Sequence, residues 1–405
     1  MNKKVLIIGF FFIIAYFAQL FYIGSINKDI FDQFTKENDI YKVENVNFQK
    51  GIFRSNASFD LVFKDSSLSS ALKEKTPVKI VFHNNFFYKN NLEIDFGNPF
   101  KELDPILKDK LLAKIYVDIT LAKEMKLSVH FSDFNSSNLY HVNFISKNMI
   151  ADIDLNKNML MQSISLNIDE ISFKSKYDIK PIIYKGISYK EEYKNGINLL
   201  NITKDVRESI SNISIENINI YEFVDISKIY LGNILSFNDD NKTFKDELKL
   251  DIAKIRISSK FMPEQNISNV NLNLVFNNIS KSDLNELVNG RYVNQDNFLE
   301  NFASYRPNFT LSNFSLVKDG KNIVAKADGL MEDFGYKINS NIISDSKISE
   351  IFPASVILNL DDYFVEKDGK YEMDFVFDST DENSTKMSIN GKDVISNNNT
   401  TFLID

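Results

Sequence analysis

The sequence predicts a mainly β protein with minor α content: an N-terminal transmembrane helix, then large, curved, mostly antiparallel sheets with a few short helices. Three observations predict this class. An apolar run opens the chain, apolar residues alternate with polar ones after residue 40, and turn-like clusters of Asn, Asp, Ser and Gly separate the alternating segments. A chain of 405 residues, 43% of them hydrophobic, is long enough for one large or two ordinary cores.

The apolar run extends from Val5 to Gly24 after Lys3 and Lys4, and only Gln19 interrupts it. About 20 such residues cross a bilayer as a helix, whereas a cleaved signal peptide has a shorter core and a small-residue exit. We therefore expect an uncleaved anchor over residues 1–24, with a signal peptide as the alternative. The lysines should stay in the cytoplasm, so the rest of the chain would lie outside.

Residues 25–45 are expected to form a membrane-proximal helix or linker. Ile26, Ile30, Phe31 and Phe34 recur at helical spacing. A plain linker with a few apolar residues is the alternative interpretation.

Strands are predicted wherever the apolar residues alternate. In the first such segment, entered through Gly51, the alternating residues Ala57, Phe59, Leu61 and Phe63 define one face. The later segments are residues 79–88, 114–122, 126–134, 139–146, 163–176, 212–223, 248–261, 269–276, 308–317, 355–360 and 371–377.

Three short helices are expected among the strands. Residues 103–114 begin with Asp104 as a cap and Pro105 in the first turn, and residues 280–290 end at Gly290. Residues 294–304 form the third.

Two segments resemble each other. Residues 166–177 and 250–261 share a pattern in which Ile168 and Ile171, or Ile252 and Ile255, are separated by two residues instead of one. This step shifts the alternation by one position, as a β-bulge does, and predicts a bent strand in both places. Chance similarity in a chain rich in Ile and Asn is the alternative.

No proline-rich or low-complexity linker marks a domain boundary. The softest segment is residues 232–247, so the β-rich body is divided there into residues 46–240 and 241–405.

Composition excludes several functions. The net charge of −8 comes without a dense basic stripe, which argues against nucleic-acid binding. The absence of cysteine excludes disulfides and thiolate chemistry. Of the three histidines, His130 and His141 face each other across a turn, but with His83 far away they supply no third metal ligand.

We therefore predict no metal, no cofactor and no catalytic residue. No nucleotide-binding or hydrolase motif occurs, and the acid pairs Asp239–Asp240 and Asp361–Asp362 have the context of solvated turns.

One modification motif recurs more often than expected. The bacterial N-glycosylation pattern Asp/Glu-x-Asn-x-Ser/Thr occurs at Asn135, Asn241, Asn266 and Asn383, all in turn-like contexts. Use of these sites requires a periplasmic body in an organism with the transferase. The alternative is that polar turns in an Asn-rich chain generate such strings.

The segment "QKGIFRSNASFDLVF" after the anchor resembles the signature of the YdgA-like family of bacterial inner-membrane proteins. Gly51, Phe53 and Ser55 fit it, while Lys50 stands where arginine is usual. His83 fits a later His-Gly-Pro motif, in which Asn84 and Asn85 replace Gly and Pro. The order of elements over residues 269–330 is also similar. The resemblance implies an envelope location and no established chemistry.

These observations predict a non-enzymatic, single-pass inner-membrane protein with its bulk in the periplasm, working in envelope maintenance. It would bind a lipid or a protein partner along a curved sheet, a logic similar in style to that of AsmA-like bridge proteins. The sequence does not distinguish an open apolar groove from a closed sandwich. The alternatives are a structural or assembly factor, acting as a dimer through exposed strand edges, and a hydrolase with an unrecognised site.

Overall fold

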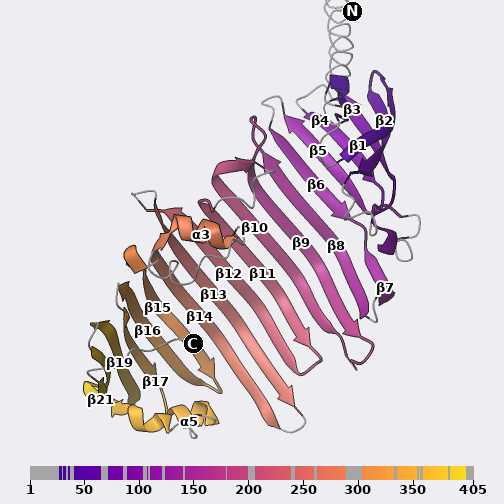
Figure 1. The fold of residues 1–405 in the computed structure, drawn as a ribbon. Coiled ribbons are helices and arrows are strands. Elements are labelled where there is room, and N and C mark those ends of the chain that lie inside the picture. Colours follow the sequence, from indigo (N-terminus) through magenta and orange to yellow (C-terminus); the bar gives the residue numbers. More distant parts are fainter. Residues whose placement is uncertain are drawn as a thin grey trace, which may run out of the picture. The chain divides into compact units, whose positions relative to one another are not determined.

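A computed structural model gives the fold of the chain (Figure 1). It describes residues 27–29, 31–32, 35–36, 41–64, 72–84, 89–103, 107, 110–120, 124–139, 142–178, 180–198, 206–238, 242–259, 262–288, 303–332, 335–353, 355, 359–381 and 384–397. The chain divides into two compact units, Met1–Asp178 and Ile179–Asp405. The boundary expected near residue 240 falls instead inside the second unit.

The first unit contains an antiparallel sheet in which most strands pair with their neighbours in sequence. Its elements are β1 (Tyr41–Gln49), β2 (Arg54–Phe63), β3 (Thr76–Asn84), β4 (Lys89–Phe96), η1 (Lys101–Leu103), β5 (Ala113–Thr120), β6 (Met125–Phe131), β7 (Phe134–Leu139), β8 (Val142–Leu155) and β9 (Leu160–Ser175). Strands β6 and β7 both pair with β8, each along a different part of it, and β9 pairs with β8 as well.

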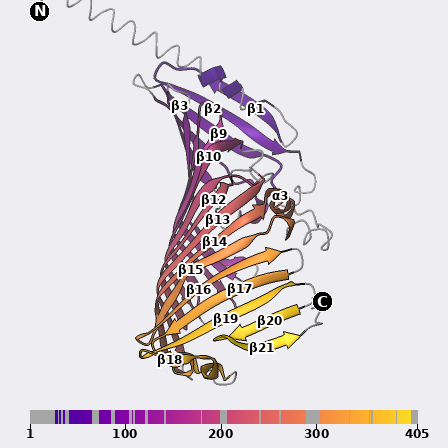
Figure 2. The ribbon, with the colours of Figure 1, turned by 90° about the vertical axis from the view of Figure 1, so that its left-hand side faces the viewer.

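The second unit is also antiparallel, and its strands can be followed one after another in Figure 2. Its elements are β10 (Ile182–Asn198), β11 (Ser209–Ile220), β12 (Val224–Phe237), β13 (Thr243–Ser259), β14 (Met262–Ser280), α3 (Lys281–Val288), β15 (Asn308–Lys318), β16 (Lys321–Glu332), β17 (Gly335–Ser344), α5 (Ile348–Ile351), η4 (Leu360–Tyr363), β18 (Val365–Lys367), β19 (Lys370–Asp381), β20 (Ser384–Ile389) and β21 (Lys392–Asn397). Strands β17 and β18 both pair with β19. The prediction of a mainly β, antiparallel fold with few short helices is confirmed.

Tight turns close three hairpins of the second unit. Asp319–Gly320, Asp368–Gly369 and Asn390–Gly391 each lie between two paired strands, and both residues of each turn have positive φ. This is the geometry of a type I′ turn, whose twist matches that of the flanking strands. Glycine and the short polar residues Asn and Asp tolerate it best, which explains these dipeptides.

A line of unusual backbone conformations crosses strands β10 to β14. Gly186, Lys228 and Asn269, in alternate strands, have φ between +51° and +59°, while Glu216 and Ala253 lie opposite them in the strands between. The pairing keeps the same register on both sides of this line. At this line the alternation of side chains between the two faces shifts by one residue in every strand. Because all the strands shift together, their pairing register does not change.

This line gives the Ile-x-x-Ile pattern its structural meaning. Ile252 and Ile255 of β13, on either side of the line, pack in one cluster with Ile267 and Val270 of β14. The apolar residues therefore stay on one face along the whole strand. In the first unit, Asn148 (φ +48°) lies at the equivalent step opposite the Ile168–Ile171 segment, again without a change of register. The shifted alternation is confirmed. The bulge expected to cause it is absent at both steps, because the paired strands shift together and keep their register.

The core of the first unit lies against strands β2 to β5. Val78, Ile80 and Phe82 of β3 are at most 4% exposed. The ring of Phe31, from the helical residues 27–29 and 31–32, packs 6.5 Å from that of Phe82. Phe48 of β1 adds a further ring 5.3 Å from Phe31, so aromatic side chains close this core.

The predicted helices are partly corrected. Helix α3 confirms the helix expected at 280–290, and Ser280 caps it by accepting a hydrogen bond from the Asp283 amide at 3.3 Å. The helix expected over residues 103–114 does not reach its predicted end, because β5 already begins at Ala113. Asp104, Pro105, Gly290 and most of residues 294–304 lie outside the described residues. Residues 355–360, expected as a strand, instead include the start of η4.

The predicted anchor, residues 1–24, also lies outside the described residues. Within the described part of the chain, none of the helices has the length and apolar character required to span a bilayer.

Candidate functional site

The second unit has one strongly apolar face. A row of side chains crosses it from strand to strand in direct register, from β10 to β17 and on to β19. The row consists of Tyr189, Ile213, Leu231, Leu250, Leu272, Phe314, Ala325, Ile342 and Met373. We call the side of the second unit that carries this row the apolar face.

The reverse side of the same strands is polar. The adjacent row of that side contains Ser188, Ser214, Tyr230, Asp251, Asn271 and Ser315. Lys249 and Asp251 form an ion pair of 3.0 Å there, and Lys245 pairs with Glu247 at 2.6 Å. Because strand alternation sends successive side chains to opposite faces, the strands place most of their apolar residues on one face and most of their polar residues on the other.

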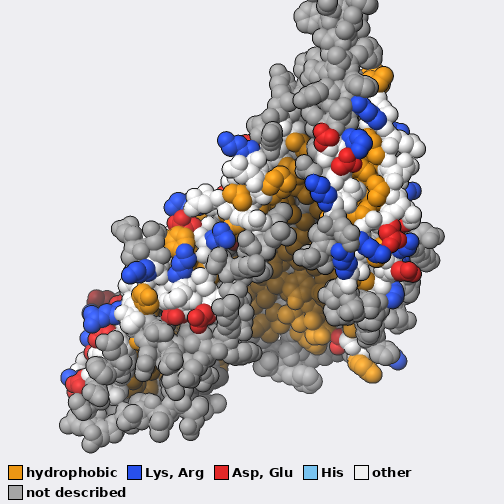
Figure 3. All heavy atoms as spheres, turned by 45° about the horizontal axis from the view of Figure 1, so that its top comes forward, with side chains coloured by type: hydrophobic (Ala, Val, Ile, Leu, Met, Phe, Trp, Pro, Cys, Tyr) orange, Lys and Arg blue, Asp and Glu red, His pale blue; other side chains and the backbone are white. Residues whose placement is uncertain are grey.

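The apolar face is only partly covered. Leu231, Leu250 and Leu272 lie in the middle of the row, yet all three are half-buried rather than buried. Figure 3 shows a hollow in which hydrophobic side chains gather, while charged side chains lie elsewhere on the surface. Exposed apolar area of this extent on a folded protein indicates an interaction surface.

A cavity of about 490 Å³ opens on the apolar face next to α3. Phe276 of β14, Phe309 of β15 and Ile338 of β17 line it, and Leu284 of α3 closes one side. Gly329 of β16 belongs to its wall, where a Cβ atom would lie 2.0 Å from the Phe309 ring. The absence of a side chain at this position leaves room for that ring.

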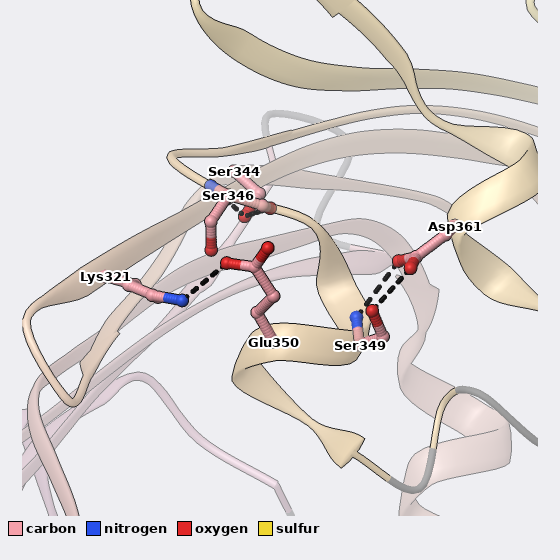
Figure 4. Close-up of polar contacts among 6 residues, drawn as sticks. All are labelled: Lys321, Ser344, Ser346, Ser349, Glu350 and Asp361. Carbon is pink, nitrogen blue, oxygen red and sulfur yellow. Dashed lines mark hydrogen bonds and ion pairs between the residues drawn. The ribbon is translucent and has the colours of Figure 1, made fainter.

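One part of the apolar face does have a lid. Ile348 and Ile351 of α5 are buried against Val270, Leu316 and Ile323 of the sheet. Polar contacts hold this segment in place (Figure 4).

These contacts join α5 to β16 and η4. Lys321 forms an ion pair of 2.6 Å with Glu350, and Asp361 of η4 accepts hydrogen bonds from the Ser349 amide, at 3.0 Å, and from the Ser349 hydroxyl. The Ser349 hydrogen bonds hold the pKa of the Asp361 carboxyl below its ordinary value. Asp361 is therefore not the merely solvated acid that its turn-like context suggests.

Polar groups interrupt the apolar face at one corner, on strands β10 to β13. Glu191 accepts hydrogen bonds from the hydroxyls of Tyr189 and Tyr193 at 2.5 and 2.7 Å. Burial, together with these bonds to a carboxylate, raises the pKa of both tyrosines. Nearby, the Asn233 amide donates to Asp246, whose pKa is raised by burial.

Gly51, Phe53 and Ser55, on which the resemblance to the YdgA-like signature rests, lie at the entry to β2. The Gly51 amide donates to the hydroxyl of Ser55, which is fully buried, at 3.3 Å. A Cβ atom at Gly51 would lie 2.1 Å from the Arg54 carbonyl oxygen, so this turn needs glycine. Phe53 is 57% exposed, and His83 pairs with Arg54 across β2 and β3.

The described histidines do not meet. His83 lies in β3 with its Nε2 atom 3.2 Å from a Glu93 carboxylate oxygen. His130 lies in β6, close to Ser128 (3.1 Å) and Tyr116. His141 is outside the described residues. Within the described ranges no three His, Asp or Glu side chains form a group that would hold a metal ion.

The glycosylation motifs that can be placed lie in strands and not in turns. Asn135 is an exposed residue of β7. Asn266 is a half-buried residue of β14 whose amide donates to Glu264 at 3.1 Å. The turn context expected for both is wrong, because the polar residues around them continue the strand. Asn241 and Asn383 lie outside the described residues.

No protein-family model, curated protein or solved structure matches this chain. The function is therefore argued from the apolar face itself.

Proposed function

We propose that this chain is a non-enzymatic, membrane-anchored protein of the bacterial cell envelope that binds the acyl chain of a lipid along its apolar face. The observation that carries the proposal is the half-buried row centred on Leu231, Leu250 and Leu272, on a sheet whose reverse side is polar. Contact of such an apolar face with water is unfavourable. An apolar ligand that covers the face would remove this cost.

The dimensions suit an acyl chain. The row crosses nine strands, β10 to β17 and β19, and neighbouring strands are about 4.8 Å apart, which gives roughly 38 Å. A bilayer holds two chains end to end in a hydrocarbon layer of about 30 Å, so one chain needs roughly 15 Å. The apolar face is therefore long enough for a complete acyl chain.

The chemistry of the face favours lipid over peptide. The main-chain groups of β11 to β14 are engaged with neighbouring strands on both sides, so an extended peptide finds no edge to join in the middle of the face. An acyl chain needs only apolar contact, which this row supplies.

The principal alternative is an assembly factor that dimerises through strand edges. Among the described strands, β1 pairs only with β2, which leaves it at an edge. However, β1 changes register between Glu44 and Asn47, and Asn45 has a φ of +53°. Irregularities of this kind protect edge strands against pairing with another chain.

The test is native mass spectrometry of the full chain after gentle extraction, with Leu250→Asn compared with wild type. Leu250 lies on the apolar face, and Ile210→Asn is the matched control because Ile210 is 47% exposed on the reverse side. We expect co-purified lipid on the wild type, and binding about tenfold weaker for Leu250→Asn, since a polar amide replaces roughly one buried apolar contact.

Ile210→Asn should retain the lipid of the wild type. An empty protein that forms a dimer would contradict the proposal and favour the assembly role. Equal lipid binding by both variants would show that the occupant lies elsewhere.

A further inference from the structure

The polar corner of the apolar face adjoins a second cavity. We define the corner by five side chains that share the apolar face across β10 to β13: Glu191, Ser209, Ser211, Asn233 and Asp246. Along the same rows, towards β14 and β15, apolar residues such as Leu248, Leu274 and Phe276 follow. One end of the face is thus polar and the rest is apolar.

The second cavity has a volume of about 260 Å³, and its walls come from β10, β12, the segment before β11, and α3. Tyr193 and Phe237 supply aromatic walls, and Arg207 and Lys281 supply two cations. The ammonium group of Lys281 lies 4.4 Å from the centre of the Phe237 ring, in a cation–π contact.

The two cations are carried by elements that are fixed to each other. The amide of Val206, next to Arg207, donates to the side chain of Asn285 in α3 at 2.6 Å. Lys281 is the first residue of that helix. Arg207 and Lys281, which are far apart in the sequence, are therefore held at one cavity.

The charge of the cavity is positive. Its wall includes one acid, Glu208, but Glu208 is bonded to Lys194 at 3.0 Å and to the Phe237 amide at 3.2 Å. Among the lining residues, the two cations Arg207 and Lys281 outnumber the single acid, so the lining carries a net positive formal charge.

We propose that this cavity binds the phosphate-bearing head group of a phospholipid whose acyl chains lie on the apolar face. The inference rests on the proposed function and adds the class of lipid. Arginine binds phosphate oxygens through two parallel hydrogen bonds, and lysine adds a mobile positive charge.

Helix α3 connects the two ends of this site. Lys281 lines the cationic cavity, and Leu284, three residues later, lines the apolar cavity of about 490 Å³. Residues three apart are neighbours on a helix surface. Polar and apolar sites at neighbouring positions of one short helix match an amphiphile, with its head at Lys281 and its tail at Leu284.

The experiment compares three probes with the full chain in detergent: phosphatidylglycerol, diacylglycerol with the same acyl chains, and glycerol phosphate. Binding is measured by displacement of a fluorescent lipid. We expect the wild type to bind phosphatidylglycerol at least about tenfold more tightly than diacylglycerol, and glycerol phosphate much more weakly than either.

The variant is Arg207→Gln with Lys281→Gln, and its control is Lys185→Gln with Lys254→Gln. The control removes two exposed lysines, one in β10 and one in β13, at positions flanking Gly186 and Ala253. The test variant should lose about 10- to 100-fold in phosphatidylglycerol affinity while its diacylglycerol affinity stays unchanged. The control should behave as wild type.

Several outcomes would overturn the inference. Equal wild-type affinity for phosphatidylglycerol and diacylglycerol removes the head-group site but leaves acyl-chain binding intact. Tight binding of glycerol phosphate alone assigns the cavity to a soluble phosphate compound. Failure of both lipids to bind removes the proposed function itself. If the double variant does not fold, Lys281→Gln alone should show the same selective loss at smaller size, and no loss would contradict the site.

Discussion

The two units use the same alternating strands to different ends. In the first unit, Val78, Ile80 and Phe82 are buried because Phe31 and Phe48 pack over their side chains. In the second unit, Leu231 and Leu250 have the same kind of position in register and remain half-buried. The comparison teaches that alternation determines which face is apolar, whereas a covering element determines whether that face becomes a core or a surface.

The largest expected effect on the free energy of unfolding comes from removing a buried side chain from the core of the first unit. Phe82→Ala should lower the free energy of unfolding by about 3–5 kcal/mol, because it removes a buried ring and leaves a cavity among Phe31, Phe48 and the strands. Leu250→Ala on the open face should cost only about 1 kcal/mol, since little of the lost contact was buried. Urea unfolding of the two variants measures both values. Equal losses would show that the apolar face is as well packed as the first core.

The next effect on stability concerns α5, which covers part of the apolar face of the second unit. Ile351→Ala should cost about 2–3 kcal/mol, because Ile351 of α5 is 2% exposed and packs against the sheet. Val365→Ala in β18, where the side chain is 54% exposed, is the matched control and should cost less than about 0.5 kcal/mol. Binding of an apolar dye should rise for Ile351→Ala alone. A dye signal unchanged from wild type would mean that α5 does not limit access to the apolar face.

A smaller effect should appear at acid pH in the same lid. Because the pKa of Asp361 is depressed in the folded state, its contribution to stability is complete above the ordinary carboxyl pKa and is lost as the pH falls through the folded value. Asp361→Asn should therefore be less stable than wild type at neutral pH, and the difference should shrink below a pH of about 4. Thermal unfolding across this range tests it, with the exposed neighbour change Asp362→Asn as control. A difference that persists at pH 2–3 would indicate that charge is not the cause.

The smallest effect has the opposite sign. Burial raises the pKa of Asp246, so the folded state holds its proton more tightly, and stability falls as the pH rises from the ordinary carboxyl pKa through the folded value. Asp246→Asn should gain at most about 0.5 kcal/mol at neutral pH, and nothing in acid. Measuring unfolding at pH 7 and pH 3 checks the sign. A loss at pH 7 would show that the hydrogen bond from Asn233 to the carboxylate outweighs its burial.

Much of this fold follows from local signals. The alternation in residues 248–261 and 308–317 predicts β13 and β15, and Asp319–Gly320 predicts a tight turn. The strand expected at 355–360 failed for a physical reason. A short apolar run fits a helical turn as well as a strand, and here Leu360 belongs to η4 and packs, partly buried, against the cluster that contains Ile348 and Ile351.

The candidate site was harder to predict, because it depends on register. Glu191 and Asp246 look like ordinary polar residues in their strands, and they share a corner only through the pairing of β10 to β13. Arg207 and Lys281 have no common motif in the sequence. Only the packing of α3 against the segment before β11 brings them to one cavity.

The left-handed residues Gly186, Lys228 and Asn269 have one further consequence. The alternation of side chains shifts at the same line in every strand from β10 to β14. A further hairpin with the same spacing of isoleucines would therefore pair beside these strands without a change of register. The sheet is thus modular. Duplication of a hairpin in the gene would lengthen the sheet, and each copy would carry its own left-handed residue and extend the apolar face by two strands.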